Sequence, residues 1–136
     1  MAATVLVDAG FLIALLSRRD TNHDWALAQA QQFAPPWTTC EAVLSEAFHL
    51  LASRGGRRLA ELLRRRAVLC GFRFGDDTEA VLRLLSRYDN VPISFADACL
   101  VRLTETTNDP ILLTTDTDFR IYRRHGRQTI PCLLPL

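Results

Sequence analysis

Lysine is absent from this chain of 136 residues, and all sixteen of its basic residues are arginine. The absence excludes a Walker-type phosphate loop, a Schiff-base lysine and a lysine general base, because each of these needs an amine side chain. Arginine instead offers a rigid planar fork that suits phosphate and carboxylate groups. A GC-rich genome would also favour arginine over lysine, so composition alone does not explain the choice.

Long apolar runs and paired cysteines are also missing. No stretch of eighteen apolar residues exists, so we expect no membrane-spanning helix. The apolar residues 11–16 lack a basic start and follow Asp8, so we expect no secretory leader and a cytoplasmic protein. The cysteines lie about thirty residues apart without a C-x-x-C pair, which favours buried, reduced thiols over disulfides or zinc. They are Cys40, Cys70, Cys99 and Cys132.

The length and the apolar pattern predict one α/β domain over residues 1–136. Continuous apolar runs at 4–7 and 111–115 indicate buried strands of a mostly parallel sheet flanked by helices. Further strands are expected at 37–39, 72–74 and 129–133. Helices are expected at 11–17, 23–33, 39–53, 57–69, 76–88 and 94–106, with a helical turn at 120–124. Arg54-Gly55-Gly56 is expected to end the third helix.

Five carboxylates lie where an acidic residue has no obvious place, beside or inside apolar segments. Burial of an unpaired carboxylate costs several kcal/mol, so such groups are normally paired, protonated or bound to a cation. Two of them end the two best strands, and ligands bind at that edge of open α/β sheets. Converging carboxylates favour a hard divalent cation. The five are Asp8, Glu46, Asp97, Asp116 and Asp118.

Each acid also has a structural explanation. Asp97 lies three residues after Ser94, as in a capping box, and an acid is favourable at the positive end of a helix. Asp116 or Asp118 can cap the helical turn that follows. Glu46 and Glu41 border the same apolar stripe, and periodicity does not choose between them. Capping would explain each acid separately, but not why Asp8 and Asp116 both follow the ends of strands. If these two strands are adjacent, the two acids are expected to be neighbours.

The four segments that carry these acids, residues 7–16, 38–46, 95–98 and 113–119, resemble in order and spacing a PIN-domain ribonuclease of the VapC toxin type. The resemblance covers nearly the whole chain and implies a PIN-like fold. It assigns Asp8, Glu46, Asp97 and Asp116 to a catalytic metal site, and so selects Glu46 over Glu41. Asp118 resembles an auxiliary acid at the metal.

Two positions next to these acids bear on the resemblance. Thr115 matches a position where many members carry a hydroxyl that supports the site. Many members also place Ser or Thr two residues after the first Asp, where this chain has Gly10. A supporting hydrogen bond is therefore expected to be missing.

The resemblance implies hydrolysis of RNA phosphodiester bonds with Mg²⁺ or Mn²⁺, leaving 5′-phosphate and 3′-hydroxyl ends. Such toxins are held inactive by a small antitoxin protein and often form homodimers, so both partners are expected. Cations must surround an acidic pocket that binds RNA. The arginine clusters at 18–19, 57–58, 64–66 and 123–124 are candidates, although solvated helix faces would explain them equally.

Other classes of protein remain as alternatives. The chain could be a stand-alone PIN nuclease, or a PIN binding module with little turnover. Phosphoryl transfer through Asp8, as in haloacid-dehalogenase-like phosphatases or response-regulator receivers, is disfavoured. The phosphatases need a second Asp where Gly10 stands, and both groups need a lysine late in the chain.

Overall fold

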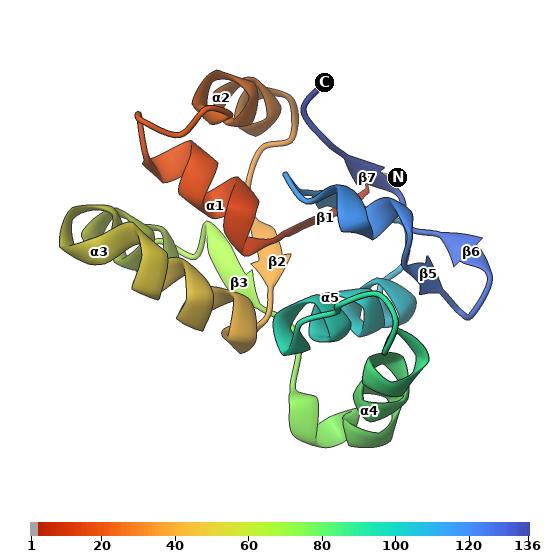
Figure 1. Ribbon diagram of the computed structural model, residues 1–136. Coiled ribbons are helices and arrows are strands. Elements are labelled where there is room, and N and C mark those ends of the chain that lie inside the picture. The colour runs from red at the N-terminus through yellow and green to blue at the C-terminus, as the bar shows by residue number, and fades with distance from the viewer. Residues whose placement is uncertain (1–2) are drawn as a thin grey trace.

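The central element is a five-stranded sheet in the computed structural model, which describes residues 3–136 (Figure 1). The strand order is β3-β2-β1-β4-β7, and every neighbouring pair in it is parallel. The strands are β1 (Thr4–Val7), β2 (Trp37–Thr39), β3 (Val68–Cys70), β4 (Pro110–Leu113) and β7 (Cys132–Leu133). The predicted α/β class with a mostly parallel sheet is confirmed.

Helices cover both faces of the sheet. They are α1 (Ala9–Leu16), α2 (His23–Gln32), α3 (Glu41–Arg64), α4 (Thr78–Arg87) and α5 (Phe95–Thr106), with short 3₁₀ helices η1 (Phe74–Asp76) and η2 (Thr117–Arg120). In Figure 1, α1 and α2 lie together above the sheet, and α4 and α5 lie together below it. Leu6, Val7, Leu112 and Leu113 are therefore fully buried, as strands covered on both faces require. No helix within residues 3–136 has the length and apolar character needed to cross a membrane.

The pairing of β1 with β4 decides which residues meet at the carboxyl edge of the sheet. Val7 lies opposite Leu113, so both strands end at the same level. On the other side of β1, the Thr39 hydroxyl at the end of β2 donates to the Val7 carbonyl at 2.7 Å. The residues that follow the three central strands are thereby brought to one edge of the sheet.

The expected division of residues 39–69 into two helical segments is confirmed, although the break lies earlier than expected. The element α3 (Glu41–Arg64) consists of two helical parts joined across a kink at Ala52, where φ is 57° and ψ is −160°. Gly55 and Gly56 do not end a helix but are buried inside its second half. A Cβ on Gly55 would lie 2.8 Å from the Leu51 side chain, so close packing explains this glycine better than a turn.

The strand expected at 72–74 lies four residues earlier, at β3. Helix α3 ends in a Schellman motif, with Ala67 N–H bonded to Leu62 O at 2.9 Å and Arg66 N–H to Leu63 O at 3.1 Å. At φ 60°, Arg66 has the left-handed backbone conformation that glycine usually adopts at a helix end. No glycine in the sequence therefore marks this end of the helix. Cys70, expected to be buried, is exposed in this edge strand, whereas Cys40 and Cys99 are buried.

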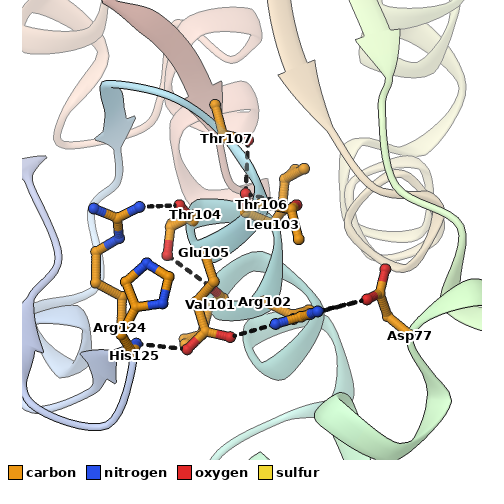
Figure 2. A network of polar contacts seen from close by, with 10 residues as sticks. All are labelled: Asp77, Val101, Arg102, Leu103, Thr104, Glu105, Thr106, Thr107, Arg124 and His125. Carbon is orange, nitrogen blue, oxygen red and sulfur yellow. Dashed lines mark hydrogen bonds and ion pairs between the residues drawn. The ribbon is translucent and has the colours of Figure 1, made fainter.

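The helical turn expected at 120–124 is also wrong. The turn η2 ends at Arg120, and the chain continues into an antiparallel hairpin of β5 (Arg123–Arg124) and β6 (Gln128–Thr129). The strand expected at 129–133 is divided between β6 and β7. Figure 2 shows the two hydrogen bonds that attach the hairpin to α5. The Arg124 side chain donates to the Thr104 carbonyl, and the His125 N–H donates to the Glu105 carboxylate. These long-range contacts compete with local helix formation.

Candidate active site

Asp8 is held from both sides at the carboxyl end of β1. One carboxylate oxygen caps α1 by accepting from the Phe11 N–H at 2.8 Å, and the other accepts a hydrogen bond from the Thr114 hydroxyl. The residue is only 6% exposed. Burial raises the pKa of Asp8 from 3.8 to about 6, although both hydrogen bonds lower it, and the charges of Asp116 and Glu46 raise it further.

Asp116 and Asp118 follow β4 in a chain of hydrogen bonds that leads to Asp8. The Asp118 N–H donates to the Asp116 carboxylate at 2.9 Å, so Asp116 caps η2 as one of the structural explanations predicted. The Asp116 N–H in turn donates to the Thr114 hydroxyl oxygen at 2.9 Å. Because Thr114 also bonds Asp8, one hydroxyl links the two strand ends. The predicted proximity of Asp8 and Asp116 is confirmed.

Asp97 approaches from the other side of the sheet, in the first turn of α5. Its N–H donates to the Ser94 hydroxyl at 3.0 Å, which is the predicted cap. Burial raises the pKa of Asp97 from 3.8 to about 7, and the negative charges of Asp116, Asp8 and Glu46 raise it further, against the Ser94 contact. Acids from β1, β4 and α5 therefore form one electrostatic cluster.

Glu46 and Glu41 differ in which neighbouring groups their charges affect. Glu46 is exposed on α3, yet its charge contributes to the raised pKa of both Asp8 and Asp97. Burial raises the pKa of Cys70 on the edge strand, and the charge of Glu41 raises it further. Glu46 is therefore the one of the two whose charge acts on Asp8 and Asp97, while its role as a ligand stays a prediction.

Two residues of the site were not found by sequence reasoning. The first is Thr114, whose hydroxyl bonds Asp8, while a supporting role of Thr115 stays a prediction. A side chain at Gly10 would meet the Thr115 hydroxyl, since a Cβ there would lie 2.2 Å from its oxygen. The second residue is Tyr122, which is fully buried. Its pKa is raised by burial and then by the charges of Asp97, Asp118 and Asp116.

The donor chemistry of the cluster fits a divalent cation. Ion pairs within residues 3–136 use Glu61, Asp76, Asp77 and Glu105, so none neutralises the five acids. Hard carboxylate oxygens suit Mg²⁺ or Mn²⁺, and a cation would relieve their repulsion. In the described part of the chain, however, no three Asp, Glu, His or Cys side chains stand close enough to hold a metal. A cation held by three of these acids would therefore need their side chains to approach one another more closely.

The arginine clusters differ in what they contact. Arg123 and Arg124 donate to backbone carbonyls, at Arg120 and Thr104 among others, so they hold the hairpin. A groove of about 660 Å³ lies between the end of α1 and the second half of α3, and we call it the α1–α3 groove. Its cationic residues are Arg18, Arg19, Arg54 and Arg58. Helix α1 has eight residues and is therefore about 12 Å long, with Asp8 before its first residue and Arg18 of the groove beyond its last.

The PIN domain family model matches residues 5–124, and the chain belongs to that family. Among solved structures, the chain is similar to Mycobacterium tuberculosis VapC20, described as a toxin that cleaves the sarcin-ricin loop. The TM-score is 0.76 with 24% sequence identity, over 85% of this chain and 92% of that one. At this identity the likeness concerns the fold. No curated protein sequence matches the chain.

Proposed function

We propose that residues 1–136 form a single PIN domain that acts as a metal-dependent endoribonuclease, hydrolysing RNA phosphodiester bonds. The observation that carries the proposal is the cluster of acids from β1, α5 and β4, in which burial and mutual repulsion raise the pKa of Asp8 to about 6 and that of Asp97 to about 7. Retaining unpaired, desolvated acids costs stability, which favours a functional reason. Family membership and the fold of VapC20 support the same reaction.

In this proposal the carboxylates of Asp8, Glu46, Asp97 and Asp116 are catalytic and hold Mg²⁺ or Mn²⁺, with Asp118 as an additional ligand. A cation held there would lower the pKa of a nearby water and offset negative charge on the phosphate. The protein's own contribution is to align the acids and to oppose part of the rise that burial causes in the pKa of Asp8 and Asp97. Thr114 and the Phe11 N–H hold the two oxygens of Asp8, and the N-terminus of α5 favours the ionised form of Asp97.

The α1–α3 groove supports RNA binding beside these acids. The ion pairs within residues 3–136 involve other arginines, which leaves Arg18, Arg19 and Arg54 available for phosphate. Contacts between guanidinium groups and phosphates would make the affinity salt-dependent and largely independent of sequence. We infer that the RNA backbone passes from the acid cluster along α1 toward this groove.

The biological role we propose is that of the toxin in a toxin–antitoxin pair in the cytoplasm. The fold shared with VapC20, itself a toxin that cleaves the sarcin-ricin loop, supports this role. The partners would be an RNA substrate, a small antitoxin protein and a second copy of the chain. A neighbouring antitoxin gene would support the role, and a chromosome without one would favour a stand-alone nuclease.

The test is cleavage of a mixed RNA pool by the purified protein, with Mn²⁺ or with EDTA. The Asp8→Asn and Asp97→Asn variants are compared with Asp24→Asn, which changes an exposed acid on α2. We expect cutting that requires Mn²⁺, is lost in the first two variants and is kept in the third. A folded wild type that binds Mn²⁺ without cutting would contradict the proposal and favour a binding module.

A further inference from the structure

Tyr122 lies behind the acid cluster and is among the largest side chains with no exposure. It follows η2, the turn that Asp116 caps and that contains Asp118. Its ring packs edge-on against Tyr88 at 5.1 Å and Phe119 at 5.4 Å between centroids. A phenylalanine would fill this aromatic cluster equally well, so packing does not explain the hydroxyl.

The hydroxyl of Tyr122 connects two segments that carry different acids. It donates to the Pro92 carbonyl at 2.9 Å. Pro92 lies two residues before Ser94, the cap of α5, and therefore at the base of the turn that holds Asp97. The hydrogen bond thus ties the segment after Asp116 and Asp118 to the start of the helix that presents Asp97.

The electrostatics agree with this placement. After burial, the charge of Asp97 is the largest cause of the raised pKa of Tyr122, which is consistent with the two side chains lying near each other. A buried hydroxyl without a partner is costly, which keeps this donor on its acceptor.

We propose that Tyr122 is a positioning residue of the candidate active site, whose hydroxyl fixes the start of α5 and so sets Asp97 against Asp8 and Asp116. The inference rests on the proposed metal-dependent function. It predicts that Tyr122 supports cation binding without contacting the cation, because groups that orient metal ligands alter metal affinity when they are removed.

The test compares Tyr122→Phe with Tyr88→Phe as the matched control. Tyr88 belongs to the same aromatic cluster, but its hydroxyl accepts from the Arg123 N–H of the hairpin at 2.9 Å. Each variant removes one oxygen and one hydrogen bond. Mn²⁺ affinity is measured by isothermal titration calorimetry, and circular dichroism checks that both variants are folded.

We expect Tyr122→Phe to bind Mn²⁺ about tenfold more weakly, and Tyr88→Phe to remain within about twofold of the wild type. In RNA cleavage, the Mn²⁺ concentration for half-maximal rate should rise with Tyr122→Phe, while the rate at saturating Mn²⁺ recovers. General destabilisation would not raise the Mn²⁺ requirement while leaving the rate at saturating Mn²⁺ unchanged. Replacement of Tyr122 by 4-fluorophenylalanine, which fills the space of the hydroxyl but cannot donate, should reproduce the effect if Tyr122→Phe folds poorly.

Wild-type affinity in folded Tyr122→Phe overturns the inference, and so does an equal loss in both tyrosine variants. A wild type that binds Mn²⁺ but cuts no RNA contradicts the proposed ribonuclease while leaving the comparison of affinities decisive for Tyr122. A wild type that binds no Mn²⁺ overturns the metal-dependent function and the inference together.

Discussion

Removing the charge of Asp8 should stabilise the metal-free protein, although the same change should abolish its activity. In the folded state the pKa of Asp8 is about 6, against 3.8 for an exposed carboxyl. The folded state therefore binds the proton more tightly. The resulting stability is present below pH 3.8 and is lost as the pH rises through about 6. A shift of about two units corresponds to about 3 kcal/mol at pH 8.

The perturbation is Asp8→Asn, because Asn can still accept from the Phe11 N–H and remains a good helix cap. Urea unfolding in EDTA at pH 8 should show the variant more stable than the wild type by up to about 3 kcal/mol. The gain should shrink toward pH 4.5, where the wild-type carboxyl is mostly protonated. Asp24→Asn, on the surface of α2, should show no such pH-dependent gain.

Added Mn²⁺ should reverse the order of stability. A cation at one hundred times its dissociation constant stabilises the wild type by about 2.7 kcal/mol, and the variant, which lacks one ligand, should gain much less. An Asp8→Asn protein that is less stable than the wild type at pH 8 in EDTA would refute the reasoning. It would mean that the Thr114 and Phe11 contacts outweigh burial.

Two further predictions concern stability. Gly10→Ala should destabilise the folded protein by about 1–2 kcal/mol, because its Cβ would lie 2.2 Å from the Thr115 hydroxyl oxygen. In a Thr115→Ala background the same change should instead stabilise the protein by about 1 kcal/mol. If urea unfolding shows that the effects of the two changes are additive, the clash is ruled out. Arg102→Met should cost about 1.5–3 kcal/mol, because Arg102 pairs with Asp77 at 2.9 Å and with Glu105, whose side chain is 10% exposed (Figure 2). Arg64→Met, which removes an exposed pair, should cost under about 1 kcal/mol, and equal losses in the two variants would contradict this.

The parts of the fold that could be predicted from sequence are those set by strong local patterns. The apolar runs of β1 and β4 identify strands covered on both faces, and the acid after each marks the edge of the sheet where the acids gather. The end of α3 could not be predicted, because Arg66 occupies the left-handed position that glycine usually occupies at the end of a helix. The β5–β6 hairpin depends on contacts with α5 that lie about twenty residues away in sequence.

Within the site, the sequence predicts which acids are unusual but not which neighbours hold them. Thr114 and Thr115 are adjacent and chemically identical, and only the pairing of Val7 with Leu113 places the hydroxyl of Thr114 on Asp8. In the sequence, Tyr122 is indistinguishable from an ordinary core aromatic residue, and only the structure shows that its hydroxyl donates to the Pro92 carbonyl. Tertiary packing determines such hydrogen bonds, and the periodicity of the sequence does not reveal them.

Three acids of the cluster also serve as local structural elements, and this determines how their chemistry can be isolated. Asp8 caps α1, Asp116 caps η2, and Asp97 lies in the capped first turn of α5. Alanine at Asp8 or Asp116 would remove a cap together with the charge, and a loss of activity would then be ambiguous. Asparagine keeps a side-chain acceptor while removing the charge, so it separates the two roles. Glu46 has no capping role inside α3, so Glu46→Gln should reduce cation binding with little effect on the fold.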